Sequence, residues 1–170
     1  INWLSQSGQS EKVTEAIQAL TRFYRLTLGS RDLISTVHDE VTHVTLYIQL
    51  QNMRYNDCAE FIADVPPELD SFSIPRLTFQ PIVENALLHG IMMKEEKKGT
   101  ILLTGWKEGN DIVFIISDDG AGIPPEKLDS LLDEHTQAVV GSSSRHIGES
   151  NTNLRLKNLY GSKYGLSFTS

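Results

Sequence analysis

Apolar residues recur every three or four positions in the first third of the chain, a spacing typical of amphipathic helices. Between Ser10 and Leu28 this series consists of Val13, Ala16, Ile17, Leu20, Phe23 and Tyr24. A second, nearly heptad series consists of Leu33, Val37, Val41, Val44 and Ile48. Gly29 separates the two series, so we predict two antiparallel helices joined by a short link. A helical hairpin of this size buries little apolar surface by itself. Its apolar stripe is covered either by helices from another domain or a second copy of the chain, or by the rest of this chain.

The pattern changes after Asp57, where a proline-rich turn region begins. Apolar spacing predicts a helix from Arg76 to His89. Two strand-like segments follow, ILLTGW (101–106) and DIVFII (111–116), and the Gly-Asn pair between them predicts a β-hairpin. The second segment is apolar at every position from 112 to 116, so we expect it to be buried on both faces. We place a domain boundary near residue 58.

The last part of the chain predicts three further elements. Pro124 and Pro125 open a short helix, and a weakly patterned stretch follows it. Asn151 is placed to cap a helix that ends before Gly161, and LSFT (166–169) begins an alternating strand.

Composition and charge argue against several classes of protein and site. The 170 residues include 15 basic and 22 acidic side chains, a net charge of −7 without a long basic block, which argues against nucleic-acid binding. No apolar run approaches the roughly 20 residues of a membrane helix. Cys58 is the single cysteine, so the chain can form neither an internal disulfide nor a cysteine-based zinc site.

Two segments carry candidate chemistry. In SDDGAGIPP (117–125), Asp118 stands at a predicted strand end, and Gly120 and Gly122 allow a close approach of a ligand. A carboxylate there can accept a hydrogen bond from an exocyclic amine such as that of adenine, although tight turns after strands often have the same composition.

The second segment is QPIVENALLHG (80–90), where Asn85 and His89 lie one helical turn apart on the polar face. An amide oxygen suits Mg²⁺, and an imidazole can donate to a phosphate. The same pair also occurs as ordinary solvated side chains on amphipathic helices.

The order of these motifs resembles the ATP-binding domain of sensor histidine kinases, which shares the Bergerat fold with gyrase, Hsp90 and MutL. More narrowly, QPIVENALLHGI (80–91), QLQNMRY (49–55) and NLRLKNLYGSKYGL (153–166) are similar to the LytS/YesM type of bacterial sensor kinase. The resemblance implies an α+β fold, a two-layer sandwich in which helices cover one face of a mixed sheet, preceded by a helical hairpin.

By position, the resemblance implies that Asn85 binds Mg²⁺ through the ATP phosphates, with His89 nearby. Asp118 would accept from the adenine amino group, while Gly120, Gly122 and Ile123 shape the pocket. Gly148 corresponds to the glycine-rich end of the ATP lid.

The family transfers the γ-phosphoryl group of ATP to a histidine and then to the receiver domain of a response regulator. Its acceptor histidine lies just before the position that corresponds to Ile1, so we expect this chain to bind ATP and Mg²⁺ without phosphorylating itself. His38 and His43 are interpreted as solvated or packed helix residues. The implied arrangement is a homodimer formed through residues 1–57, part of the helical dimerisation domain. Residues 58–170 form the ATP-binding domain without its last strand, on the cytoplasmic side of a membrane-anchored sensor.

Two departures keep alternatives open. Gyrase-type members have a catalytic glutamate where this chain has Pro81; Glu84 is a tentative base instead, and a non-kinase ATPase of the same fold is one alternative. The lid segment from Ser144 to Glu149 is poor in glycine and has an acid after Gly148. A dimerising scaffold insensitive to nucleotide is therefore the other alternative.

Overall fold

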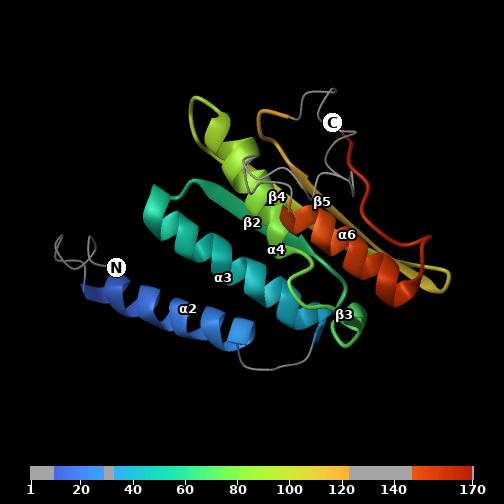
Figure 1. The fold of residues 1–170 in the computed structure, drawn as a ribbon. Helices are drawn as coiled ribbons and strands as arrows, with labels where there is room; N and C mark the ends of the chain where they lie inside the picture. Colours follow the sequence, from blue (N-terminus) through green and yellow to red (C-terminus); the bar gives the residue numbers. More distant parts are fainter. Residues whose placement is uncertain (1–9, 29–32, 123–146, 170) are drawn as a thin grey trace.

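The fold is described from a computed structural model for residues 10–28, 33–122 and 147–169, excluding the side chains of 147–150. Helices and strands follow the chain as shown in Figure 1. They are α2 (Ser10–Leu28), β1 (Ile34–Thr36), α3 (Val37–Tyr55), β2 (Ala59–Asp64), β3 (Ser73–Pro75), α4 (Gln80–Asn85), β4 (Gly99–Glu108), β5 (Asp111–Asp118) and α6 (Ile147–Tyr160). A π-helical turn, Ala86–Gly90, and a 3₁₀ turn, Ile91–Met93, continue α4.

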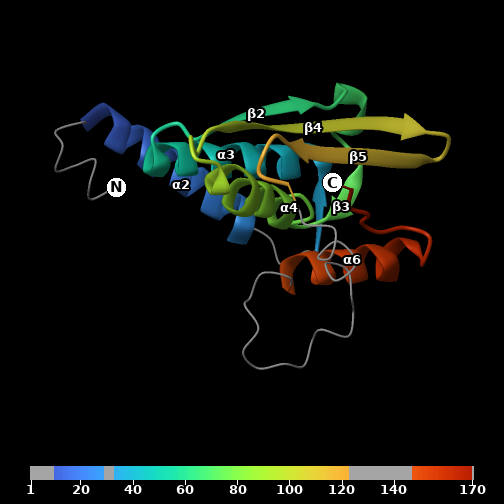
Figure 2. The same ribbon diagram turned by 90° about the horizontal axis from the view of Figure 1, so that it is seen from above.

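One sheet and the helices form two layers. The sheet has the strand order β2-β4-β5, in which β2 is parallel and β5 antiparallel to β4. Figure 2 shows the described helices on one side of this sheet. Strands β1 and β3 pair separately, in antiparallel orientation. The predicted α+β sandwich, with a mixed sheet covered on one face by helices, is confirmed.

The predicted hairpin is also confirmed. Glu108 pairs with Asp111, which leaves Gly109 and Asn110 as a two-residue loop. Gly109 has φ +61°, a value that such tight hairpin turns demand and that glycine adopts without strain.

The core lies between the sheet and helices α3 and α4. Along β4 the alternate residues Ile101 and Leu103 are fully buried, as the two-residue period of a strand requires. They belong to one cluster with Val44 of α3 and with Val83 of α4. Helix α3 therefore shares its core with the sheet, although it lies before the boundary expected near residue 58.

Helix α2 lies against α3 in antiparallel orientation, as predicted (Figure 1). Phe23 of α2 stacks on His43 of α3, with 4.3 Å between ring centroids. His43 is buried, whereas His38 is exposed beside Asp70, so both histidines fit their interpretation as helix residues. Three large apolar side chains of α2 remain exposed: Ile17, Tyr24 and Leu28.

The prediction that β5 is buried on both faces is wrong. Ile115 is 48% exposed, and Ile112, Val113, Phe114 and Ile116 are only partly buried. Among the described strands, β5 lies at the edge of the sheet and no described helix covers its outer face. Continuous apolar sequence does not distinguish such a strand from one covered on both sides.

Two helix starts also differ from expectation. Helix α4 begins at Gln80 rather than Arg76, because a regular α-helix cannot include Leu77, whose φ is +58°. Helix α6 begins at Ile147, so Asn151 lies inside it and is not its cap. Its predicted end is confirmed, since Gly161 has φ +105° and its N–H donates to the Lys157 carbonyl. Residues 166–169 form no strand in the structure, and the expected helix at Pro124 lies outside the described residues.

His43 should make stability depend on pH. Its Nε2 lies 2.8 Å from Thr27 Oγ1, whose own hydroxyl donates to the Phe23 carbonyl, so Nε2 carries the proton. Nδ1 is buried without a partner among the described residues. Burial, and then the Arg76 charge, lower the pKa of His43 below 6.5.

The unfolded chain therefore takes up the proton first as the pH falls, and stability should be lost below about pH 6.5 at up to about 1.4 kcal/mol per pH unit. Denaturant unfolding at several pH values should show a smaller loss for His43→Gln than for the parent. His38→Gln is the matched control and should keep the parent's profile. Equal profiles for the parent and His43→Gln would contradict this assignment.

Candidate functional site

Helix α4 carries the amide and imidazole of the candidate site. Asn85, its last residue, is partly buried, and His89 is exposed in the following π-helical turn. The Ile91 N–H closes this turn by donating to the carbonyl of Ala86. A π turn holds more residues than an α turn, and such turns are frequent at functional sites. His89 is thus rotated away from the strict one-turn spacing predicted from Asn85.

The end of β5 carries the carboxylate. Asp118 is exposed, and its Oδ1 accepts from the Gly120 N–H at 2.9 Å, so the side chain closes the turn that follows the strand. Within the described part of the chain its Oδ2 has no hydrogen-bond partner. Gly122 has φ +75°, a conformation that favours glycine.

These two segments touch through glycines. A Cβ at Gly90 would overlap Asp118 Oδ1, and a Cβ at Gly120 would overlap the backbone of Gly90. The Ala121 N–H donates to the Gly90 carbonyl at 3.1 Å. We call this contact of Gly90 with Asp118, Gly120 and Ala121 the glycine junction. It brings the end of the Asn85 helix against the Asp118 turn.

Asp119, which sequence reasoning did not select, fixes the turn to the sheet. Its Oδ1 accepts from the Thr100 N–H at 2.8 Å, and its Oδ2 lies 3.4 Å from Lys94 Nζ. These interactions, that with Thr100 first, lower the pKa of Asp119. Gly90 was also missed as a site residue, although a glycine after a helix is a signal for close backbone approach.

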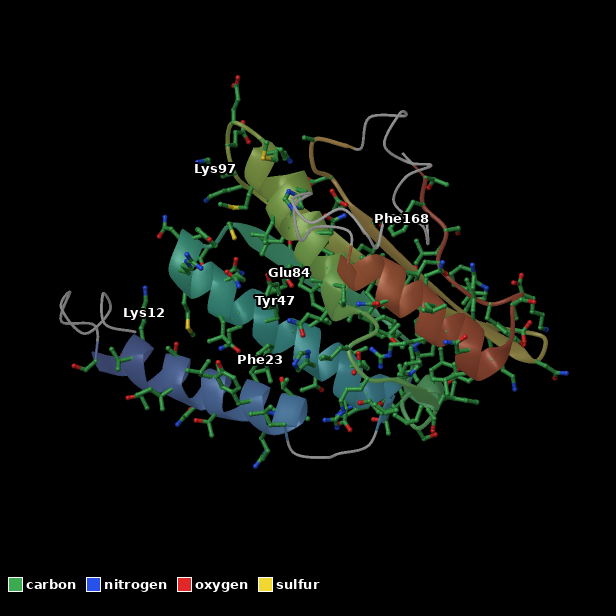
Figure 3. All side chains as sticks on the ribbon, in the orientation of Figure 1. Lys12, Phe23, Tyr47, Glu84, Lys97 and Phe168 are labelled. Carbon is green, nitrogen blue, oxygen red and sulfur yellow. The ribbon has the colours of Figure 1, made fainter. Side chains whose placement is uncertain are left out.

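Glu84, the candidate base, is exposed on α4 and lies near the contact between α3 and α4. Figure 3 shows it beside Tyr47 of α3. Burial, and then the Glu84 carboxylate, raise the pKa of Tyr47. The charge of Glu84 thus acts at the interface between two helices.

For two of the predicted site residues, Gly148 and Ile123, the structure gives no contacts with the glycine junction. Gly148 is the second residue of α6, and Ile123 lies outside the described residues. The structure therefore brings Asn85, His89, Asp118, Gly120 and Gly122 to one region through the glycine junction.

The side chains in this region suit a phosphorylated ligand with an amino-bearing base. A carboxylate accepts, an imidazole donates, and an amide oxygen can bind a hard cation. In the described part of the chain, no cluster of three or more His, Cys, Asp or Glu side chains could hold a metal ion by itself. In sites for phosphorylated ligands, substrate phosphates and waters supply most of the ligands of Mg²⁺, so the single amide oxygen of Asn85 fits this cation only when a phosphate ligand is bound.

Comparison with known families decides the assignment. Residues 73–167, more than half of the chain, match the family model of histidine kinase-, DNA gyrase B- and HSP90-like ATPases. The chain belongs to this ATPase family. Residues 1–59 match a second family model, described as histidine kinase.

Several curated relatives match most of this chain. The protein YwpD of Bacillus subtilis is 32% identical over 94% of this chain and 55% of its own length. The sensor protein LytS of Staphylococcus saprophyticus is 30% identical over 95% of this chain and 27% of its own length. The sensor histidine kinase BtsS of Escherichia coli is 29% identical over 93% of this chain and 25% of its own length. The chain thus spans between a quarter and about half of these relatives. No described helix meets the length and apolarity needed to cross a bilayer.

The glycine junction predicts the effect of one methyl group. In Gly120→Ala the new Cβ would meet the Gly90 backbone, which cannot rotate away. We expect a loss of about 1–3 kcal/mol in the free energy of unfolding, the usual range for overpacking. Ser117→Ala, at an exposed position of β5, should stay within about 0.5 kcal/mol of the parent. Denaturant unfolding of the three proteins would measure both, and a Gly120→Ala variant as stable as the parent would show that the junction is looser than described.

Proposed function

We propose that this chain binds ATP with Mg²⁺ at the glycine junction and presents the γ-phosphoryl group to a histidine outside residues 1–170. The observation that carries the proposal is the contact of Gly90 with Asp118 and Gly120. This contact supports the proposal because it joins the end of the helix that carries Asn85 and His89 to the turn that carries Asp118.

Each side chain has a role in this proposal. Asp118 Oδ2 accepts from the exocyclic amine of adenine, while Oδ1 remains engaged with the Gly120 N–H. Asn85 supplies one oxygen ligand to Mg²⁺, and His89 donates to a phosphate oxygen. Mg²⁺ reduces the repulsion between the phosphates and the incoming nucleophile. Gly122, Ile123 and Gly148 stay predictions as parts of the pocket wall and lid.

The phosphoryl transfer itself needs alignment more than covalent help from this domain. A nitrogen lone pair of the acceptor imidazole forms the new bond to the γ-phosphorus. The bond from that phosphorus to the bridging oxygen breaks, and ADP leaves with the electron pair. A carboxylate of the response regulator then takes the phosphoryl group from the histidine. Glu84 stays a prediction as a base, although its proximity to Tyr47 favours a structural role.

We also propose how the chain divides. The core shared by α3 and the sheet supports an ATP-binding unit that begins at about residue 33, before the expected boundary at residue 58. The exposed Ile17, Tyr24 and Leu28 support α2 as the part that meets a second copy in a homodimer. Membrane attachment, with this domain on the cytoplasmic side, would come from segments outside residues 1–170.

The adenine assignment is tested by removing one charge. In Asp118→Asn an amide replaces the carboxylate, and its NH₂ group can face the adenine amine, donor against donor. Calorimetric titration with a non-hydrolysable ATP analogue and Mg²⁺ should show at least about a tenfold loss of affinity, as expected when a charged acceptor is removed. Asp64→Asn makes the same charge change at the exposed end of β2 and should bind like the parent. If Asp118→Asn also binds like the parent, Asp118 does not hold the base.

The cation assignment is tested at Asn85. Asn85→Ala removes the amide oxygen, so Mg²⁺ should no longer strengthen binding of the analogue, whereas weak binding without Mg²⁺ should persist. Titrations with and without Mg²⁺ measure this difference directly. Asn110→Ala, in the exposed hairpin loop, serves as the control and should retain the parent's response. A full Mg²⁺ response in Asn85→Ala would place the cation elsewhere.

A further inference from the structure

A buried carboxylate holds the turn that leads into the Asn85 helix. Glu40 of α3 is only 2% exposed. Its Oε1 accepts from the Leu77 N–H at 2.8 Å, and its Oε2 accepts from the Thr78 N–H at 2.8 Å. Each oxygen of one carboxylate therefore binds one of two successive backbone N–H groups, across 37 residues of sequence.

This turn has a conformation that needs support. Leu77 has φ +58°, in the left-handed region where the Cβ of a residue other than glycine is too close to the backbone carbonyl. The conformation directs two consecutive N–H groups toward Glu40. In a glutamine at this position an NH₂ donor would replace one of the two oxygens, and it would face one of the two backbone N–H groups, donor against donor. The two oxygens of the Glu40 carboxylate therefore match the two backbone N–H groups that this turn presents.

The turn is one of two fixed ends of the helix that carries the site. Helix α4 starts two residues after Thr78, and the Val83 N–H donates to the Phe79 carbonyl in its first turn. At the other end, Gly90 is fixed in the glycine junction. Asn85 and His89 lie between these ends. A shift of the first end would move Asn85 relative to Asp118, which is attached to the sheet.

Helices on both sides hold the same turn. Arg76 Nη1 donates to the Thr27 carbonyl of α2 at 3.2 Å, and the Arg76 carbonyl accepts from Arg155 Nη2 of α6 at 2.6 Å. Residues 76–78 are thus bonded to α2, α3 and α6 just before α4 begins. Burial raises the pKa of the Glu40 carboxyl group, and the N–H donors of Leu77 and Thr78 oppose this shift because they bond to the ionised form.

We infer that Glu40 is a positioning residue for the nucleotide site, acting through the Leu77–Thr78 turn to set where α4 presents Asn85. This inference rests on the proposed function. It adds a residue on α3 that touches neither the nucleotide nor the cation.

The test compares Glu40→Gln with the parent and with Asp39→Asn, which removes a charge from the adjacent position of α3. Titration with the ATP analogue and Mg²⁺ should show about a tenfold weaker affinity for Glu40→Gln, the loss expected if the variant keeps the competent turn in about one molecule in ten. Asp39→Asn should bind like the parent. Amide hydrogen exchange should become faster over residues 77–83 in Glu40→Gln alone.

Rescue separates positioning from general damage. Glycine adopts φ near +58° without strain, so Glu40→Gln/Leu77→Gly should keep the turn without a carboxylate and recover part of the affinity. Thermal unfolding checks that each variant is folded at the titration temperature. If Glu40→Gln alone does not fold, the double variant carries the test: folding together with binding supports the inference, and folding without binding overturns it.

Two negative results have different meanings. If the parent binds and Glu40→Gln binds equally well, Glu40 is not a positioning residue, while the proposed function stands. If the parent does not bind the analogue, the proposed function fails and the role of Glu40 fails with it.

Discussion

The close approach of two backbone segments at Gly90 and Gly120 is the constraint on which the candidate site depends. A methyl group at either position would overlap the other segment or the Asp118 carboxylate. This contact joins the end of a helix to the turn after a strand, with the Ala121 N–H bonded to the Gly90 carbonyl. The groups proposed for the base and for the phosphates come from these two segments, so their separation is set by backbone contact rather than by flexible side chains.

The surrounding fold keeps both segments in place. Asp119 bonds the turn to Thr100 at the start of β4, and the hairpin fixes β5 against β4. On the helical side, Glu40 holds the turn before α4, and α3 packs in the same core as the sheet. The site helix is therefore attached at its start to α3 and at its end to the sheet. Through Arg76, the turn that precedes this helix also contacts α2, the helix with exposed apolar residues.

Much of this arrangement was predictable from local pattern. The helical hairpin, the strand pair around Gly109 and the end of α6 at Gly161 each depend on neighbouring residues, and each is confirmed. The motifs around Asn85 and Asp118 were recognised together because their order along the chain resembles a known family. The comparisons confirm that resemblance.

The remaining features depend on contacts that sequence periodicity does not contain. The exposure of Ile115 depends on which face of the sheet the helices cover, and this is a property of the whole fold. From the sequence alone Glu40 is expected to be a solvent-exposed helix residue, because the backbone N–H groups that bind its carboxylate are 37 residues away. From the sequence alone Gly90 is expected only to end a helix, and its contact with the Asp118 turn is known only from the fold. Leucine rarely adopts a left-handed conformation, so the sequence does not predict the positive φ of Leu77 that keeps α4 from starting before Gln80.

We propose that the glycine junction forms one site for a nucleotide, with Asp118 at the base and Asn85 at the phosphates. The most direct measurement is a crystal structure of this chain with a non-hydrolysable ATP analogue and Mg²⁺. The account predicts the adenine amine at Asp118 Oδ2 and the amide oxygen of Asn85 among the ligands of Mg²⁺. A nucleotide bound elsewhere, or bound here with its base away from Asp118, would contradict it.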